Sequence, residues 1–511
     1  MIRTARTTAL ALAACSALAA PVAAEFRFHA AFGDHMVLQR GMPTRVAGFA
    51  DQENATVEVA IAGRTATATV AKGRWTADLP ALEAGGPFEL TAISDGKKLV
   101  LKDVLAGDVW VCSGQSNMEW SMRNTDRVKE DLPTSAHDKI RLFHVDKNVQ
   151  ERPLAEPKSA QRWQPCGPRT VEHFSAVGYY FGRKLHQDAG VPIGLVEADW
   201  GGTIAEAWTS PEALAADDRL KPLVRAGALQ PGNPNQGSVL YNGMLAPLAP
   251  LSVRGAIWYQ GESNAGRAWQ YRTLFRAMIQ DWRRLFAEPD MPFYFVQLAP
   301  WDPSRKPLNR PESTAWPELR ESQRETALTL EHTGMAVITD TVDPKDMQDI
   351  HPRNKKTVGE RLAALALADV YGKTGESRGP EFAEAELHGP KASLTFRHTG
   401  SGLLVKGPKL LGFALAGPDD KFHAADAVLE GERVVVSCPQ VKEAKAVRFG
   451  WADFPVGNLF NKEGFPAGPF RTDNAKWITD QPYVAPKPPA PKKTNPKKAL
   501  PEVKAPAKKA A

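Results

Sequence analysis

The chain has 511 residues, of which 43% are hydrophobic and 24% are charged, with 40 Gly and 41 Pro. This composition is ordinary for a globular protein and excludes a collagen-like chain, a coiled coil and wholesale disorder. The formal charge of +6 arises at the two ends, because eight Lys and one Glu from Pro486 onward contribute +7, and Arg3 and Arg6 contribute +2. Residues 25–485 therefore carry about −3, which does not support a groove for nucleic acid.

The first 24 residues have the features of an export signal. Arg3 and Arg6 precede an apolar run over 9–20, and small residues at 22–24 offer a cleavage site. The run is too short for a resident membrane helix, and no later run approaches about 18 apolar residues. We therefore expect a periplasmic or secreted protein with no membrane span. Because Cys15 closes a Leu-Ala-Ala-Cys string, a lipoprotein attached through Cys15 is the alternative.

The cysteines that would remain after cleavage are Cys112, Cys166 and Cys438. Three cysteines permit at most one disulfide, so the fold cannot depend on a disulfide framework. The sequence has no Cys-x-x-Cys pair and no paired His/Cys spacing, which argues against a structural zinc site. We expect no metal and no cofactor.

The chain after the signal begins with β character and then changes. From 25 to 105, short runs alternate apolar and polar residues between Gly, Pro and Asp, which predicts a small β-sandwich-like domain with strands at 56–61, 65–70 and 88–93. From 106 to 376, continuous apolar strands alternate with helical patterns. That alternation predicts an α/β domain whose parallel sheet is covered on both faces.

The strands of that sheet are predicted at 108–112, 193–198, 255–259, 293–298 and 335–338. Its helices are predicted at 177–188, 269–286, 319–330 and 356–371. The β character returns from 377 to 483, for example at 392–396 and 433–437, and predicts a C-terminal β domain. From 484 to 511 the chain is a tail rich in Pro, Lys and Ala, for which we expect disorder because it has nothing to bury.

Four polar or glycine-rich strings follow predicted strands or precede a predicted helix, where ligands of parallel sheets bind. They are Gly-Gln-Ser-Asn-Met (114–118), Asp-Trp-Gly-Gly-Thr (199–203), Trp-Tyr-Gln-Gly-Glu-Ser-Asn (258–264) and Asp-Ile-His-Pro (349–352). Each string alone is explained equally well as a helix cap, a tight turn, a polar loop or a surface pair. The serine string is not Gly-x-Ser-x-Gly, so the α/β-hydrolase elbow does not describe it.

Together the strings supply the groups that acyl transfer to a serine needs: a hydroxyl, an imidazole, an orienting carboxylate and donors for the oxyanion. Ser116 supplies the hydroxyl, His351 the imidazole and a nearby Asp the carboxylate. Gly202 and Asn264 are the candidate oxyanion donors.

The strings at 114–118 and 258–264, with Asp-Ile-His-Pro-Arg-Asn-Lys (349–355), resemble the sialate O-acetylesterases of the SGNH hydrolase superfamily. Leu-Tyr-Asn-Gly-Met (240–244) and Asp-Trp-Gly-Gly (199–202) also resemble that family, and the likeness covers roughly 26–480. It implies a flavodoxin-like α/β/α catalytic domain that deacetylates sugars without a metal.

Carried over by motif, Ser116 is the nucleophile and His351 is the general base. Gly202, Asn264 and the amide of Ser116 would form the oxyanion hole. Further polar and aromatic side chains in the same strings are candidates for substrate binding: Gln115, Gln260, Glu262 and Trp200.

The orienting acid departs from the Asp-x-x-His spacing that is usual in the superfamily. Position 348 is Gln, and the nearest Asp is Asp349, two residues before His351. Asp349 is the first candidate, and the alternatives are Asp346, Asp343 and Glu262. An orienting acid contributes less to the rate than the Ser or the His, so a Ser-His dyad with backbone help is a further alternative.

The substrate stays open among acetylated carbohydrates. The resemblance implies an esterase of the sialate 9-O-acetylesterase type, but similar enzymes act on plant polysaccharides, so acetyl groups of xylan or pectin are alternatives. Two other classes are a serine peptidase and a carbohydrate-binding protein with a dead active site. The intact Ser, His and oxyanion positions argue against the dead site. The oligomeric state is not indicated.

Overall fold

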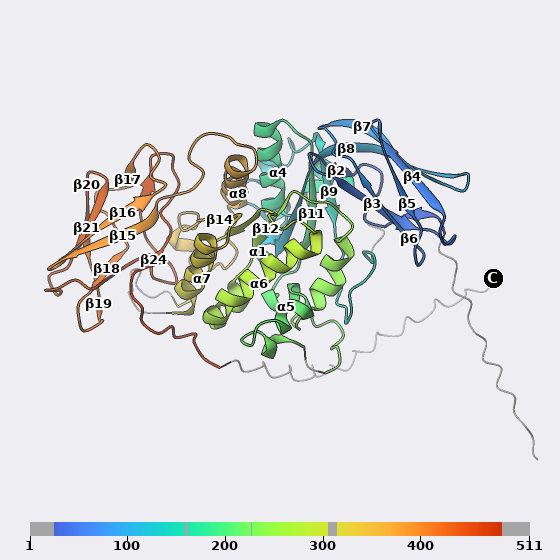
Figure 1. The fold of residues 1–511 in the computed structure, drawn as a ribbon. Helices are drawn as coiled ribbons and strands as arrows, with labels where there is room; N and C mark the ends of the chain where they lie inside the picture. The colour runs from blue at the N-terminus through green and yellow to red at the C-terminus, as the bar shows by residue number, and fades with distance from the viewer. Residues whose placement is uncertain (1–24, 159–161, 226, 305–313, 483–511) are drawn as a thin grey trace, which may run out of the picture. The chain divides into compact units, whose positions relative to one another are not determined.

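The structure is a computed structural model that describes residues 25–482 except 159–161, 226 and 305–313 (Figure 1). The predicted export signal at 1–24, with Cys15, lies outside the described residues, as does the predicted tail at 484–511. Among the described residues, no helix combines the length and the apolar character that a membrane span requires.

Two sheets form the N-terminal part of the described chain, drawn in blue in Figure 1. One sheet consists of β1 (Arg27–Phe28), β3 (Thr44–Phe49) and β6 (Arg74–Leu79). The other joins the first half of β8 (Lys97–Gly114) to β2 (Val37–Gln39), β4 (Thr56–Ile61), β5 (Arg64–Thr69) and β7 (Gly85–Ser94). Alternate residues of β4, namely Val57, Val59 and Ile61, are buried, as expected of a strand with one face on a core.

β8 connects this N-terminal part to the central sheet. Its first half pairs with β7, and its last residues pair with strands of the central sheet. The boundary predicted between 105 and 106 falls inside β8, where Leu105 and Ala106 pair with β2. A continuous strand therefore joins the two parts, with no linker between them.

The central sheet has the strand order β10-β9-β11-β8-β12-β13-β14. Its other strands are β9 (His137–His144), β10 (Gln164–Cys166), β11 (Ile193–Asp199), β12 (Gly255–Tyr259), β13 (Phe293–Val296) and β14 (Thr333–Ala336). Neighbouring strands along this order are parallel, except that β10 is antiparallel to β9. Every residue of β11, β12 and β13 is buried, which explains why these strands are apolar apart from Glu197 and Asp199 near the end of β11.

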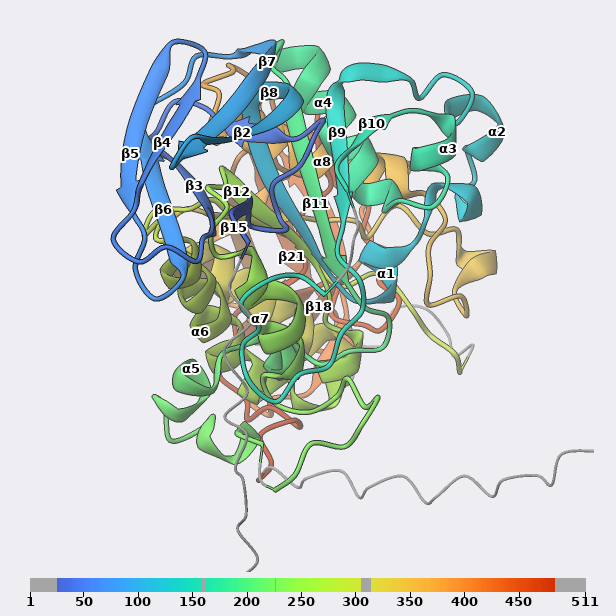
Figure 2. The same ribbon diagram turned by 90° about the vertical axis from the view of Figure 1, so that its right-hand side faces the viewer.

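Helices cover both faces of this sheet (Figure 1 and Figure 2). One face carries α4 (Ala176–Ala189) and α8 (Lys355–Asp369), and the other carries α6 (Ala268–Phe286) and α7 (Ala315–Thr329). Successive residues of a strand point to opposite faces. Ile257 of β12 accordingly joins the core under α4 and α8, whereas Trp258 packs against Trp282 of α6 with ring centroids 5.7 Å apart. The predicted α/β sheet covered on both faces is confirmed.

Short helical segments connect these elements. They are α1 (Ser116–Glu119), η1 (Met122–Asn124), α2 (Val128–Asp131), α3 (Pro168–Val171), η2 (Ala205–Trp208), α5 (Pro211–Ala215), η3 (Lys221–Leu223), η4 (Tyr241–Leu245), η5 (Ala246–Leu248), η6 (Glu262–Arg267) and η7 (Pro344–Asp346). Two of them, α1 and η6, directly follow the neighbouring central strands β8 and β12 and carry residues of the predicted site.

The C-terminal part is built of β-sheets. One sheet has the order β15-β16-β21-β20 and another the order β19-β18-β22-β24, while β17 pairs with β23. The bounds are β15 (Glu381–His388), β16 (Lys391–Arg397), β17 (Leu403–Val405), β18 (Phe413–Ala416), β19 (Phe422–Ala424), β20 (Asp426–Glu430), β21 (Arg433–Ser437), β22 (Ala446–Phe449), β23 (Leu459–Asn461) and β24 (Phe470–Arg471). Leu394, Val434 and Phe449 belong to one buried apolar cluster between these sheets.

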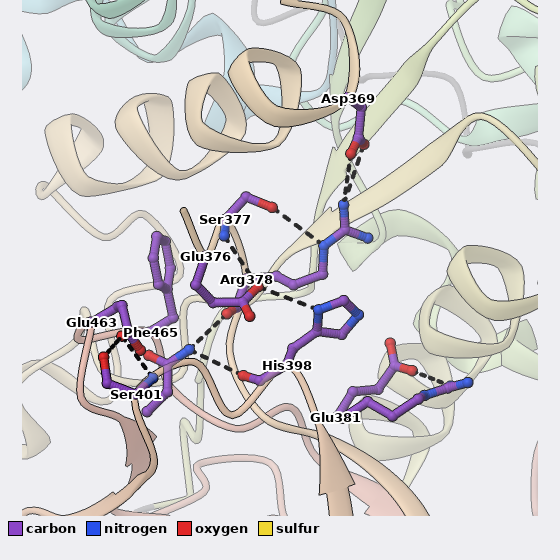
Figure 3. A network of polar contacts seen from close by, with 11 residues as sticks. Asp369, Glu376, Ser377, Arg378, Glu381, His398, Ser401, Glu463 and Phe465 are labelled. Carbon is purple, nitrogen blue, oxygen red and sulfur yellow. Dashed lines mark hydrogen bonds and ion pairs between the residues drawn. The ribbon is translucent and has the colours of Figure 1, made fainter. Parts of the chain in front are cut away.

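Polar contacts fix the segment that leads from α8 into these sheets (Figure 3). Arg378 Nη2 lies 3.2 Å from each carboxylate oxygen of Asp369, the last residue of α8. The carbonyl of Arg378 accepts a hydrogen bond from Asn461 Nδ2 at 2.9 Å, and Glu376 Oε1 lies 3.2 Å from His398 Nδ1. The segment is thereby held to the helix on one side and to the β-sheets on the other.

Candidate active site

Ser116 lies in a turn directly after the central strand β8. The turn begins at Gly114, whose φ is 143°, and a Cβ built on Gly114 would lie 2.2 Å from the carbonyl oxygen of Tyr259 on β12. Only glycine permits this approach. Gln115 donates its N–H to the same carbonyl at 3.0 Å, and the half-buried Ser116 then begins α1. The turn therefore presents the Ser116 hydroxyl at the carboxyl edge of the sheet.

His351 lies in the loop between β14 and α8 and meets Ser116 across this edge. His351 Nε2 is 2.9 Å from Ser116 Oγ, although the two residues are 235 positions apart in the chain. The indole of Trp120 stacks on the imidazole, with ring centroids 4.9 Å apart and an interplanar angle of 20°. The stacking fixes the plane of the imidazole, so the structure brings together the predicted nucleophile and the predicted base.

The surroundings of His351 favour its neutral form. Partial burial lowers the pKa of the imidazole, and the positive charge of Lys355 lowers it further. The carboxylate of Asp349 raises this pKa, but with a smaller effect. A neutral imidazole with Nε2 beside a hydroxyl can accept its proton, which is the task of a general base.

Asp349 contacts His351 through the backbone. The N–H of His351 donates to Asp349 Oδ1 at 2.9 Å. In the part of the chain that the structure describes, no carboxylate forms a hydrogen bond or ion pair with the imidazole itself. Of the alternative acids, Asp343 and Asp346 are exposed, and Asp343 binds Lys345, with its Oδ2 3.2 Å from Lys345 Nζ.

Asn117 and Lys355, for which the motifs predicted no role, form a buried link behind the Ser116–His351 pair. Lys355 Nζ donates to Asn117 Oδ1 at 2.5 Å, and both side chains are inaccessible to solvent. Asn117 Nδ2 donates to the carbonyl oxygen of Ile350 at 3.0 Å and to Glu262 Oε1 at 2.6 Å. One carboxamide therefore binds the serine turn to the histidine loop, to the start of α8 and to η6. Asn117 lies in the motif at 114–118 and Lys355 in the motif at 349–355, so their place in these motifs was the signal that could have indicated a functional role.

Burial shifts the pKa values of the two charged side chains in this link, Lys355 and Glu262. The pKa of Lys355 is lowered to about 7, mainly by burial, against the opposing effect of Glu262 and Asp349. The ammonium also lies 5.6 Å from the ring centroid of Trp120 and 5.2 Å from that of Tyr259. Burial has the opposite effect on a carboxyl group and raises the pKa of Glu262. The Oε2 atom of Glu262 has no hydrogen-bond partner among the described residues. Glu262 thus contacts Asn117 in this structure, not the imidazole.

The glycine turn after β11 lies against the serine turn. A Cβ built on Gly201 would lie 3.3 Å from Ser116 Cβ, and the Gly201 N–H donates to Glu119 Oε2 at 2.5 Å. Gly202 has φ 73°, and a Cβ built on it would meet no atom within 4 Å. The turn is anchored by Trp200, whose N–H donates to the Gly114 carbonyl at 3.2 Å. A side chain at position 202 would therefore point into open space, while the preceding Gly201 lies against Ser116.

Asn264 is held in place by its neighbours. Its Oδ1 accepts from the Ala205 N–H at 2.9 Å and from Gln260 Nε2 at 2.6 Å, and its Nδ2 donates to Glu206 Oε2 at 2.9 Å. Glu206 in turn pairs with Arg267 at 2.6 Å. A carboxamide nitrogen carries two hydrogens, so Asn264 keeps one more donor beyond the bond to Glu206.

The candidates for substrate binding divide into two groups. Gln115 and Gln260 are 3% and 0% exposed and bind protein groups, since Gln115 Oε1 accepts from the Ser263 N–H at 3.2 Å and Gln260 Oε1 accepts from the Tyr271 hydroxyl at 3.1 Å. Trp200 and Glu262 are half-buried. This second pair presents some surface, although Oε2 of the Glu262 carboxylate is itself buried and Oε1 is bound to Asn117.

Two buried acids, also without an assigned role in the sequence analysis, lie on β11 behind the glycine turn. Burial is the main cause that raises the pKa of both Glu197 and Asp199. Glu197 Oε2 lies 3.0 Å from His144 Nδ1, and this hydrogen bond raises the pKa of His144. Asp199 has no hydrogen-bond partner for either carboxylate oxygen among the described residues. Across the described ranges, no group of three or more His, Cys, Asp or Glu side chains is arranged to hold a metal ion.

The family described as "Carbohydrate esterase, sialic acid-specific acetylesterase" matches residues 106–368 of this chain. The sialate O-acetylesterase of Homo sapiens is 32% identical over 411 residues, which are 73% of this chain and 76% of that protein. The sialate O-acetylesterase of Rattus norvegicus is 33% identical over 407 residues, 68% of this chain and 74% of that protein.

A solved structure is similar over almost the whole fold. It is a carbohydrate acetylesterase from Xanthomonas citri that is 38% identical, with a TM-score of 0.80 over 88% of this chain and 100% of the other. The family match covers both the serine turn and the histidine loop described above. The chain therefore belongs to the sialic acid-specific acetylesterase family of carbohydrate esterases, and it is a carboxylic ester hydrolase with a mixed α/β fold.

Proposed function

We propose that the protein removes O-acetyl groups from carbohydrates by transferring each acetyl group first to Ser116 and then to water. The observation that carries the proposal is the 2.9 Å distance between Ser116 Oγ and His351 Nε2. Membership of an acetylesterase family supports the choice of an acetyl ester as the bond that is cleaved.

The first half of the reaction forms the acetyl-enzyme. Neutral His351 takes the proton of the Ser116 hydroxyl through Nε2 while Oγ attacks the acetyl carbonyl carbon. The carbonyl oxygen becomes an oxyanion. As the tetrahedral intermediate collapses, the bond to the sugar oxygen breaks, and that oxygen leaves with the proton held by His351.

Three donors are proposed for the oxyanion: the N–H of Ser116, the N–H of Gly202 and the second hydrogen of Asn264 Nδ2. The open space at Gly202, directly after the Gly201 that lies against Ser116, supports the assignment of the Gly202 N–H. The other contacts of Asn264 fix the orientation of its carboxamide and support the assignment of its Nδ2. Preorganised donors of this kind stabilise the charge that develops in the transition state.

The second half of the reaction regenerates the enzyme. His351 is neutral again after the sugar leaves, so it takes a proton from a water molecule that attacks the acetyl carbon. Collapse of the second intermediate breaks the bond to Ser116 Oγ, which recovers the proton from His351 and releases acetate.

Asp349 is proposed as the acid that supports His351. Its carboxylate accepts the His351 N–H at 2.9 Å and raises the pKa of the imidazole. A negative charge so placed stabilises the imidazolium that forms during each attack. In this proposal Asp349 acts through its charge and through the backbone, in place of a bond to Nδ1.

The test of the nucleophile is Ser116→Ala, assayed on 4-nitrophenyl acetate. We expect kcat to fall by at least about a thousandfold. The thermal midpoint should not change, because the half-buried hydroxyl contributes little packing. Ser401→Ala, at an exposed serine of the C-terminal sheets, is the matched control. Turnover retained by Ser116→Ala would rule out Ser116 as the nucleophile.

The proposed substrates are O-acetylated sialic acids or acetylated plant polysaccharides. The names of the mammalian relatives support sialic acid, whereas the Xanthomonas citri protein is named more broadly as a carbohydrate acetylesterase. Acetate release from O-acetyl sialic acids, acetylated xylan and acetylated pectin, compared at equal enzyme concentration, distinguishes these classes. Cleavage of peptides without acetate release would instead indicate a peptidase, and no turnover at all a binding protein.

We also propose that the chain is exported, on the basis of Arg3, Arg6 and the apolar run over 9–20. Export predicts a mature protein that begins at Glu25 and fractionates with the periplasm or the medium. A mature N-terminus at Cys15 carrying lipid would replace this proposal with that of a lipoprotein.

A further inference from the structure

A pocket of about 500 Å³ opens beside the first turns of α6, and two tryptophans line it. Trp269 belongs to α6 and Trp477 to the segment after β24, and their ring centroids are 5.4 Å apart. The guanidinium carbon of Arg272 lies 4.4 Å from the centroid of Trp269 and 5.0 Å from that of Trp477. Trp269 is 37% exposed and Trp477 7%, so Trp269 offers the accessible ring.

The charged side chains of the pocket are matched in pairs. The pairs in its walls are Arg272 with Glu325, Arg324 with Glu321 and Arg471 with Asp473. At the rim, Lys476 Nζ lies 3.9 Å from Asp480. An ionic ligand would have to compete with these pairs, and separating Arg272 from Glu325 or Arg324 from Glu321 would break a partly buried ion pair, which is costly. A hydroxyl can accept from a guanidinium and donate to a carboxylate while the pair stays intact, so the pocket favours a neutral, hydroxyl-rich ligand.

The wall of the pocket is held in place before any ligand binds. The buried Glu318 of α7 accepts the Ile478 N–H at 2.7 Å, the Thr479 N–H at 3.0 Å and the Thr479 hydroxyl at 2.6 Å. The backbone N–H of Trp269 donates to Thr479 Oγ1 at 3.0 Å. These bonds fix the segment of Trp477 against α6 and α7, and a preformed pocket loses less entropy when it binds a ligand.

The pocket begins close to the proposed oxyanion hole. Trp269 follows Asn264 by five residues, across the end of η6 and the start of α6. At a helical rise of about 1.5–2.0 Å per residue, the two backbones are about 10 Å apart along this path. A chain of a few sugar residues spans such a distance, so one polysaccharide could reach both places.

We propose that this pocket binds uncharged sugar residues of the polysaccharide whose acetyl ester is cleaved at Ser116, with one sugar ring packed on Trp269. The apolar face of a sugar ring packs on an indole, and the hydroxyls at its edge take the hydrogen bonds that the paired charges offer. The proposal rests on the proposed function, because it assigns the pocket to the same substrate. This proposal favours neutral polysaccharides as the substrate over free acetylated sialic acid, because sialic acid carries a carboxylate and is a single sugar residue.

The test measures binding without turnover. Xylohexaose, cellohexaose and hexagalacturonate are titrated by calorimetry into Ser116→Ala protein, and into the same protein carrying Trp269→Ala, Trp269→Phe or Leu328→Ala. Leu328 is the matched control, because it is also 37% exposed and lies on α7 outside the pocket. We expect at least one neutral hexasaccharide to bind, at least about fivefold weaker binding after Trp269→Ala, a smaller loss after Trp269→Phe, and no change after Leu328→Ala.

Several results would overturn the proposal. They are the absence of binding by both neutral hexasaccharides, binding by hexagalacturonate alone, and an equal effect of Trp269→Ala and Leu328→Ala. The proposed function has a separate readout, since the wild-type protein must hydrolyse 4-nitrophenyl acetate whether or not the pocket binds sugar. Failure of that hydrolysis would remove the esterase mechanism, while the titration would still decide whether the pocket is a sugar site.

Discussion

Lys355 Nζ lies 2.5 Å from Asn117 Oδ1, and both side chains are shielded from solvent directly behind the Ser116–His351 pair. This contact joins the first residue of α8 to the second residue of α1, 238 positions away. Through Asn117 Nδ2 it also holds the Ile350 carbonyl, one residue before His351. The position of the proposed base relative to the proposed nucleophile therefore depends on a buried lysine that is hydrogen-bonded to neither.

The pH dependence of the wild-type enzyme follows from the pKa of His351. Burial and the charge of Lys355 lower this pKa below the ordinary value of about 6.5. Since the neutral imidazole is the active form, kcat/KM should be constant near neutral pH and fall only as the pH drops through the lowered pKa. A pH–rate profile on 4-nitrophenyl acetate measures this. An acid limb with its midpoint above 6.5 would contradict the assignment.

Lys355→Met should move that acid limb to higher pH. Lys355, with a pKa of about 7, is protonated where His351 titrates, and its charge disfavours the imidazolium. Removal of the charge lets the His351 pKa rise, so the neutral base is lost earlier on acidification. Loss of the bond to Asn117 should also lower kcat by about tenfold to a hundredfold through misplacement of the base.

Lys356→Met is the matched control for Lys355, because Lys356 is the next residue and is only half-buried. Its profile should coincide with that of the wild type. A Lys355→Met enzyme with reduced kcat but an unmoved acid limb would indicate a purely structural lysine.

Asp349→Asn should move the acid limb in the opposite direction. The carboxylate raises the His351 pKa, so its neutralisation lowers that pKa further and extends activity to lower pH. The amide oxygen of Asn can still accept the His351 N–H, and we expect kcat to fall only on the order of tenfold. Asp346→Asn, at an exposed neighbour, serves as the comparison. If Asp346→Asn shifts the limb and Asp349→Asn does not, Asp346 is the supporting acid.

Asn264→Ala should lower kcat by about a hundredfold to a thousandfold with little change in KM, as expected for the loss of an oxyanion donor. It should also lower the free energy of unfolding by about 1–3 kcal/mol, because Glu206 Oε2, Gln260 Nε2 and the Ala205 N–H lose a buried partner. Asn461→Ala is the control, since Asn461 is equally buried and donates to the carbonyls of Arg378 and His398. If Asn461→Ala is destabilised to a similar extent but keeps its kcat, while Asn264→Ala loses kcat, the effect of Asn264 on catalysis is distinct from its effect on stability.

Strands whose sequences are apolar throughout could be located from the sequence. The strand predicted at 255–259 is β12 to the residue, and the helices predicted at 177–188, 269–286, 319–330 and 356–371 differ from α4, α6, α7 and α8 by at most four residues at either end. β9 could not be located in this way, because it begins with His137, Asp138 and Lys139, which interrupt the apolar pattern before the buried residues 140–143. Only its pairing with β11 reveals it as a strand of the sheet.

The motifs by themselves determined which residue types are available for chemistry: a serine, a histidine and glycine or amide donors at the ends of parallel strands predict acyl transfer wherever the intervening chain runs. Only the tertiary structure decided which groups surround them. In sequence, Lys355 is an ordinary lysine just before a predicted helix and Asp349 is the nearest acid to His351; in the fold the lysine is buried and bound to Asn117, and the acid binds the backbone of His351. The reason is that the burial of Lys355 depends on Asn117, 238 residues away, and the direction of the Asp349 side chain depends on the local turn of the folded loop, whereas residue type depends on no contact at all.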